Sequence, residues 1–182
     1  MSQNNYKLKI VESLLKSENH IRGLAKSLGT NQTTIARKVK ALEQENVVDF
    51  KEEGRNKVVF LRKTLEAKHF GYMVETEKLI ETIAQYPFLR RIIEAIQKNK
   101  KIMLAVLFGS FTTGSAYEKS DIDIYIDTKE TALKQEIASL DSRISVKIGS
   151  YDQDSLLIKE IEKKHVVIKG VELFYEKNKF FD

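Results

Sequence analysis

Apolar residues recur every three or four positions along the first third of the chain, the spacing of helices that bury one face. This spacing predicts three helices, at residues 6–17, 21–28 and 32–45. Asn31 has the side chain of an N-cap for the third helix, and Asn46 after it tolerates the left-handed backbone that often ends helices. Two strands, at residues 47–51 and 57–62, then flank a turn at Gly54. Three helices and a hairpin are therefore expected here.

The next stretch, residues 64–99, keeps helical spacing throughout. Thr64 caps its first helix, and Pro87, the single proline of the chain, starts its second. Long amphipathic helices between two domains commonly pair two copies of a chain, so a homodimer is one expectation. Packing of the same helix against its own chain is the alternative.

Strand and helix patterns alternate in the last part of the chain. The apolar run Ile102–Phe108 predicts a buried strand that ends at Gly109-Ser110, and residues 121–126 alternate polar and apolar side chains as a second strand. Further helices are expected at residues 129–140 and 155–164, and further strands at residues 144–148 and 171–175. This order predicts an αβ domain.

Two acids, Asp121 and Asp123, lie two positions apart on that second strand and therefore on the same face of it. Their charges repel unless a cation lies between them, and Mg²⁺ typically takes one or two carboxylates together with substrate phosphates. Gly109-Ser110 offers a phosphate an unobstructed backbone, a hydroxyl and amide groups. Metal or nucleotide binding is expected, and the alternative is a solvated pair of acids on a strand edge.

The Gly-Ser pair, the ten-residue gap and the Asp-x-Asp pair resemble the signature of nucleotidyltransferases related to DNA polymerase β, specifically the minimal nucleotidyltransferases. Gly114 and Ser120, inside the gap, extend the match. The resemblance covers roughly residues 100–176 and implies an αβ domain with a mixed sheet. It also implies transfer of a nucleoside monophosphate from a nucleoside triphosphate (NTP) to a hydroxyl, with release of pyrophosphate. Some minimal nucleotidyltransferases modify a companion protein, which makes a protein acceptor an expectation beside a nucleic acid.

Site residues follow from the resemblance by position. Gly109 and Ser110 correspond to the residues that hold the β- and γ-phosphates, and Asp121 and Asp123 to catalytic carboxylates that bind Mg²⁺. A third carboxylate normally lies on the next strand, but residues 143–148 contain no acid. The candidate positions hold Ser145 and Lys147, which leaves three nearby acids as candidate substitutes: Asp141, Asp152 and Asp154.

Charge divides the chain unevenly. Its net charge is +5, yet residues 1–64 contain 13 Lys and Arg against 7 Asp and Glu, and residues 65–182 contain 18 against 19. A basic N-terminal third beside a nearly neutral remainder is typical of a nucleic-acid-binding module joined to another domain. The chain has no cysteine, no apolar run near the roughly 18 residues of a membrane span and no signal-peptide pattern at its start. It is therefore expected to be cytoplasmic, without membrane partners.

The run NQTTIARKVKALEQENVV resembles the recognition helix of bacterial and archaeal winged helix-turn-helix regulators. The resemblance implies binding to double-stranded DNA. Side chains expected in the major groove are Gln32, Thr33, Thr34 and Arg37, those expected near phosphate are Lys38 and Lys40, and those expected on the wing are Arg55 and Lys57. Glu52 and Glu53 add negative charge beside that wing. A winged helix that serves only protein association is the alternative.

The sequence thus predicts an α+β protein: a winged helix-turn-helix at residues 1–63, a helical linker at 64–99 and a nucleotidyltransferase-like domain at 100–182. The first expected function is a DNA-binding protein that binds Mg²⁺ and NTP and transfers a nucleoside monophosphate. The rival is a transcription regulator whose degraded nucleotidyltransferase domain serves as a nucleotide sensor or a dimerisation scaffold. The missing third carboxylate favours the rival, and the intact Gly-Ser and Asp-x-Asp pairs favour the enzyme.

Overall fold

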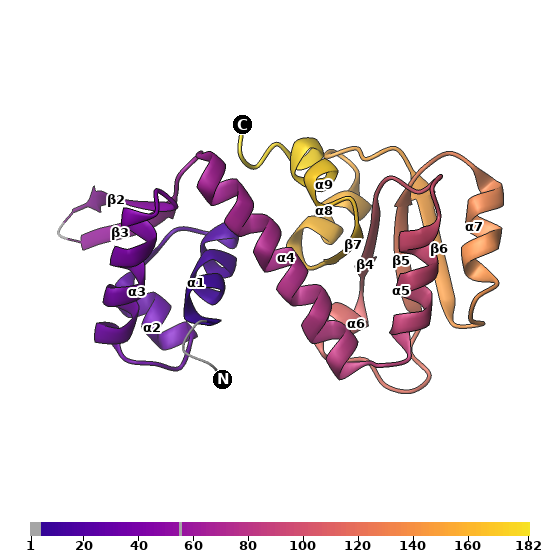
Figure 1. The fold of residues 1–182 in the computed structure, drawn as a ribbon, viewed down its shortest axis with the longest axis horizontal. Helices are drawn as coiled ribbons and strands as arrows, with labels where there is room; N and C mark the ends of the chain where they lie inside the picture. Colours follow the sequence, from indigo (N-terminus) through magenta and orange to yellow (C-terminus); the bar gives the residue numbers. More distant parts are fainter. Residues whose placement is uncertain (1–4, 55) are drawn as a thin grey trace. The chain divides into compact units, whose positions relative to one another are not determined.

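The computed structural model describes residues 5–54 and 56–182 and divides the chain into two compact units (Figure 1). Unit 1 is residues 1–74 with 181–182, and unit 2 is residues 75–180. Helix α4 (Leu65–Gln85) contributes residues to both. No helix among the described residues is long and apolar enough to cross a membrane.

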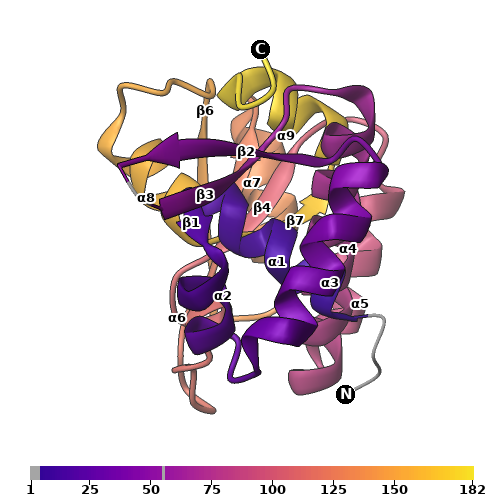
Figure 2. The ribbon, with the colours of Figure 1, turned by 90° about the vertical axis from the view of Figure 1, so that its left-hand side faces the viewer.

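Unit 1 consists of helices followed by a hairpin. Its elements are α1 (Asn5–Lys16), β1 (Asn19–His20), α2 (Ile21–Ser27), α3 (Gln32–Gln44), β2 (Val48–Glu53) and β3 (Asn56–Leu61). The strands form an antiparallel sheet in the order β1-β3-β2, seen in Figure 2. The three predicted helices and the hairpin are confirmed, while β1 was missed because two residues are too short for a periodic pattern.

The ends of α3 show why it starts and stops where it does. The backbone N–H of Thr34 donates to Asn31 Oδ1 at 2.8 Å, which confirms the predicted N-cap. Asn46 follows the helix with a φ of 61°, the left-handed conformation that its short side chain tolerates. The Asn46 side-chain oxygen accepts from Arg62 at 2.6 Å, and its carbonyl accepts from the Thr64 hydroxyl at 2.7 Å. These bonds join the end of α3 to the start of α4.

Unit 2 is built on a mixed four-stranded sheet. After α4 its elements are α5 (Leu89–Lys98), β4 (Ala105–Phe108), α6 (Ser110–Thr113), β5 (Ile122–Asp127), α7 (Thr131–Ala138), β6 (Ile144–Gly149), α8 (Leu156–Lys163), β7 (Val166–Lys169) and α9 (Val171–Asn178). The strand order is β6-β5-β4-β7; β5 and β6 are parallel, and β4 is antiparallel to both β5 and β7. The mixed sheet expected from the sequence is therefore present.

Alternation along β5 gives the sheet two different faces. Ile122, Ile124 and Ile126 are fully buried in a core that also contains the inward residues of α5 and α7. Tyr125 and Asp127 point to the opposite face, where the Asp127 carboxylate accepts from Lys177 on α9 at 2.8 Å. Helix α9 therefore contacts the acid-bearing face of the sheet at the C-terminal end of β5.

The end of the chain corrects one sequence expectation. Residues 171–175 were predicted to be a strand, but they begin α9, and the closing strand is β7 just before them. Gly170 separates the two elements with a φ of +79°, and a Cβ there would lie 2.2 Å from the Met103 carbonyl oxygen. Phe174 and Tyr175 are buried on one face of this helix, and a mostly apolar stretch of five residues does not distinguish a helix from a strand.

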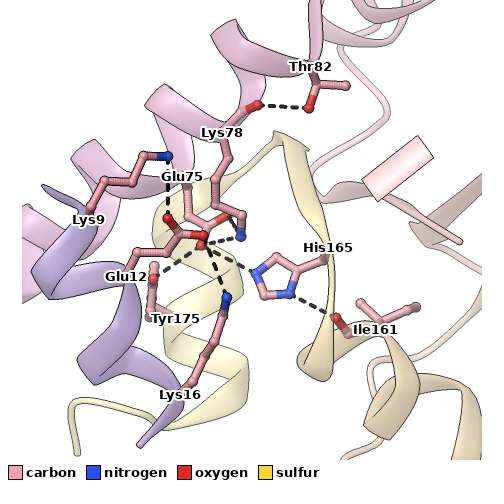
Figure 3. A network of polar contacts seen from close by, with 9 residues as sticks. All are labelled: Lys9, Glu12, Lys16, Glu75, Lys78, Thr82, Ile161, His165 and Tyr175. Carbon is pink, nitrogen blue, oxygen red and sulfur yellow. Dashed lines mark hydrogen bonds and ion pairs between the residues drawn. The ribbon is translucent and has the colours of Figure 1, made fainter. Parts of the chain in front are cut away.

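A buried carboxylate, Glu75, ties α4 to the end of unit 2 (Figure 3). It is 2% exposed and accepts from Lys78 at 2.9 Å, from His165 Nε2 at 3.3 Å and from the Tyr175 hydroxyl at 3.4 Å. The other ring nitrogen of His165 donates to the Ile161 carbonyl at 2.8 Å. Both ring nitrogens face acceptors, so the positively charged imidazolium satisfies both contacts.

Candidate active site

Three strand ends meet where the sequence placed its candidate chemistry. Phe108, the last residue of β4, pairs with Asp123, so Gly109 follows directly beside the acid pair. On the other side of β5, Asp123 pairs with Ser145 at the start of β6. The structure therefore brings Gly109, Ser110, Asp121 and Asp123 together at one end of the sheet.

Gly109 is required by its surroundings. Its φ of +75° and ψ of −149° lie in a region that is essentially restricted to glycine. A Cβ on this residue would lie 2.5 Å from Asp123 Oδ2, well inside contact distance. The bare backbone at Gly109 thus lets the Asp123 carboxylate lie against the strand end, and Ser110 begins the short helix α6 immediately after it.

The electrostatics of the acid pair fit a cation. The pKa of Asp123 is raised because burial disfavours its charge; the hydroxyl of Ser145 and the charge of Lys147 oppose this rise, and the charges of Asp121 and Glu160 add to it. Among the described residues, neither Asp121 nor Asp123 forms a salt bridge with a lysine or arginine. A partly buried carboxylate beside a second one, with no salt bridge, matches what one Mg²⁺ takes together with phosphates.

A second divalent cation does not fit the residues present. Within residues 5–54 and 56–182, no group of three or more acidic, histidine or cysteine side chains could hold a metal. Asp141 is instead bound to Arg143 Nε and Nη2 at 3.0 and 2.9 Å, which hold its pKa at about 2. Asp152 accepts from the backbone N–H of Asp154, whose own side chain is 99% exposed. None of the three candidate substitutes joins the pair.

Sequence reasoning missed Arg143, which organises the loop before β5. Its Nη1 donates to the Glu118 carbonyl at 2.9 Å, and its own carbonyl accepts from the N–H of Ile122 at 2.9 Å. Its guanidinium also lies 4.6 Å from the centre of the Phe88 ring. Arg143 therefore fixes the segment that presents Asp121. An Asp-x-Arg pair before a strand is a visible signal, but it does not reveal which loop the arginine holds.

The predicted DNA-contacting residues lie mainly on α3. Thr33, Arg37 and Lys40 are exposed and, at spacings of four and three, share one face of the helix. Three further residues named from the sequence, Gln32, Thr34 and Lys38, belong to the same helix, and of them Gln32 is exposed and the others are half-buried. Lys57 is exposed on β3, with its Nζ 5.9 Å from the Phe50 ring centre. The second predicted wing residue, Arg55, lies outside the described residues.

A family model described as Polymerase beta, Nucleotidyltransferase matches residues 90–180, half of the chain. The chain belongs to this nucleotidyltransferase family. Domains of the family generally use an NTP and a divalent metal, so the site at Gly109 and the acid pair lies inside a domain of nucleotidyltransferase type. A second family model, described as HVO_A0114, matches residues 4–64. No curated protein matches the chain.

Proposed function

We propose that the chain is a nucleotidyltransferase that binds an NTP with Mg²⁺ at the junction of β4, β5 and β6 and transfers a nucleoside monophosphate to a hydroxyl of a protein or nucleic acid. The observation that carries this proposal is the contact between the forced glycine, Gly109, and the Asp123 carboxylate. Gly109 adopts a conformation that would strain any residue with a Cβ, and it lies against a partly buried acid, as expected of a position kept for the site.

In this proposal, different residues of the chain bind the cation and the phosphates. Asp121 and Asp123 hold the cation, whose charge, when it is bound, offsets that of the triphosphate. The backbone around Gly109 leaves room for a phosphate, and the Ser110 hydroxyl donates to one of its oxygens. The acceptor oxygen bonds to the α-phosphorus as the bond from that phosphorus to the bridging oxygen breaks. Pyrophosphate leaves, and the acceptor's proton passes to water. Catalysis here is chiefly positioning and charge neutralisation.

The test is transfer of label from each α-³²P-labelled NTP, with Mg²⁺, into protein or RNA of a host lysate. Asp123→Asn removes one charge at the site, and Asp154→Asn removes one from a fully exposed side chain. Label with wild type and Asp154→Asn but not with Asp123→Asn is the expected result. No label, combined with no rise in melting temperature on adding Mg²⁺ and NTP, would overturn the site assignment.

The rival regulator function has its own distinct result. Within the described residues no group of three carboxylates could hold a metal, and this favours the regulator. A nucleotide sensor or dimerisation scaffold of this kind would still raise its melting temperature with Mg²⁺ and NTP, yet transfer no label. The same labelling experiment, run with the thermal measurement, therefore separates enzyme from sensor.

For the N-terminal region we propose a winged helix-turn-helix that binds double-stranded DNA and acts in transcription regulation. Supporting this are the order of three helices and a hairpin, the basic excess of residues 1–64 and the exposed face of α3 with Thr33, Arg37 and Lys40. In this proposal residues 1–63 bind DNA, 64–99 link, and 100–182 carry the transfer site. The setting is cytoplasmic, and a homodimer through α4 and a companion protein acceptor belong to the same proposal.

Arg37→Ala tests the DNA contact. It should weaken salt-sensitive binding to double-stranded DNA and reduce the slope of log affinity against log salt. Lys134→Ala, an exposed charge on α7, is the matched control and should leave both unchanged. Equal binding by Arg37→Ala and wild type would contradict the assignment of α3 as the recognition helix.

A further inference from the structure

The strand beside the acid pair, β6, carries a serine and a lysine, Ser145 and Lys147, at the two candidate positions for the absent third acid. β6 is the edge strand of the sheet and runs parallel to β5, with Asp123 opposite Ser145 and Tyr125 opposite Lys147. Residues two apart on a strand share a face, so Ser145 and Lys147 lie on the face of Asp123. Asp123 and Lys147 are diagonal neighbours on this face, and the charge of Lys147 acts on the Asp123 carboxylate.

The charges facing Asp123 come from three elements. Asp121 from β5 and Glu160 from α8 are negative, Lys147 from β6 is positive, and the Ser145 hydroxyl donates to the carboxylate. Glu160 is near enough to act on Asp123 electrostatically, but no metal-holding group of three such side chains exists among the described residues. Lys147 is exposed and forms no salt bridge in that part of the chain. Its ammonium is thus available at the site.

A carboxylate on β6 would attract a second metal ion. Lys147 instead presents a positive charge, which repels one. Two-metal sites hold their ions about 3.5 to 4 Å apart by sharing carboxylates between them. Here no carboxylate on β6 can serve as that shared ligand, and Lys147 on the same strand brings a positive charge to the face of Asp123. An ammonium beside a triphosphate neutralises negative charge as a metal ion does, although it acts as a point charge and not as a ligand-orienting centre.

We propose that this site takes a single divalent cation, held by Asp121 and Asp123, and that Lys147 replaces the second cation by binding the triphosphate directly. This inference rests on the proposed nucleotide site and specifies its metal stoichiometry and a further binding residue. Because a charged contact to phosphate is lost, Lys147→Met should raise the Kd for Mg²⁺-NTP by about tenfold to a hundredfold.

The experiment counts Mn²⁺ by electron paramagnetic resonance in the full chain with a non-hydrolysable α,β-methylene NTP. Wild type should bind one Mn²⁺ per chain in the ternary complex, without coupling between two metal centres. Lys147→Met should also bind one Mn²⁺ but with weaker nucleotide affinity, whereas Lys134→Met, on α7, should match wild type. Ser145→Asp restores an acid opposite Asp123 and should admit a second, coupled Mn²⁺.

The possible outcomes distinguish failure of this inference from failure of the proposed nucleotidyltransferase function. Two coupled Mn²⁺ in wild type would overturn the single-cation site and leave the nucleotidyltransferase proposal standing. Unchanged nucleotide affinity in Lys147→Met would overturn the role of the lysine alone. No binding of Mn²⁺ or nucleotide by wild type would overturn both proposals. Because Lys147 lies exposed on an edge strand, its variant is expected to fold, so the inference remains testable even if Ser145→Asp does not.

Discussion

The buried acid Glu75 gives a stability prediction whose size follows from its surroundings. Burial by itself raises the pKa of Glu75, but the hydrogen bond from His165 and the charges of His165 and Lys78 outweigh it and hold the pKa at about 2, against an ordinary 4.5. Each unit of pKa corresponds to about 1.4 kcal/mol, so the network contributes roughly 3 kcal/mol at neutral pH. Because the folded-state pKa is lowered, this contribution is complete above pH 4.5 and is lost as the pH falls towards 2.

Glu75→Gln keeps the shape of the side chain and removes its charge. At pH 7 its free energy of unfolding should fall by about 3 kcal/mol, since the charges of His165 and Lys78 lose their partner. At pH 3 the gap between the variant and wild type should shrink to about half, because protonation begins to remove the same charge from wild type. Urea denaturation followed by circular dichroism at both pH values measures the two gaps.

The control for this prediction is Glu176→Gln, which removes the same charge from an exposed position on α9. It should stay within about 0.5 kcal/mol of wild type at both pH values. The reasoning would be refuted if Glu75→Gln unfolded as wild type does at pH 7. A gap that stayed constant from pH 7 to pH 3 would also refute it, because that would assign the loss to shape and not to charge.

Three further variants test the site and unit 1. Gly109→Ala should cost about 1 to 3 kcal/mol from its glycine-only backbone and, by displacing Asp123, abolish the thermal shift with Mg²⁺ and NTP. Gly114→Ala is also strained, but its Cβ would make only an ordinary contact with Gln85 Nε2 at 3.9 Å, so it should keep that shift. Arg143→Lys should speed amide hydrogen exchange across residues 117–122, and unchanged exchange there would show that the loop does not depend on the guanidinium. Asn31→Ala should lower the stability of unit 1 by about 1 kcal/mol in thermal denaturation, whereas Asn31→Asp, which retains the cap, should not.

Local signals in the sequence predicted most of the helices and strands, and they predicted that Asp121 and Asp123 share one face of a strand. Asn31 caps α3 through a bond to a residue three positions away, and Asp121 and Asp123 share a face through the two-residue period of a strand. Both properties depend on neighbours in the chain, which the sequence displays directly. The same holds for the helical spacing after Pro87, where α5 buries Leu89, Ile92, Ile93 and Ile96.

Properties that depend on distant partners were not visible in the same way. In the sequence, nothing distinguishes Glu75 from the exposed acids of an amphipathic helix. Its hydrogen-bond partner His165 lies ninety positions later in the chain. The arginine that holds the loop before β5, Arg143, bonds a carbonyl 25 positions earlier. The resemblance gave Ser145 and Lys147 as candidate positions on the next strand, and only the pairing of β5 with β6 shows that Ser145 is the one opposite Asp123.

The position of the acid pair is fixed by the core and not by the acids. Ile122, Ile124 and Ile126 are completely buried, and a shift of one residue along β5 would move all three out of this core and place the acids in it. The free energy that holds Asp123 beside Gly109 therefore comes from the isoleucines on the opposite face, while burial and the charge of Asp121 work against it and raise its pKa. A site of this kind holds unfavourable negative charge on a rigid strand, and a bound cation can then offset that charge.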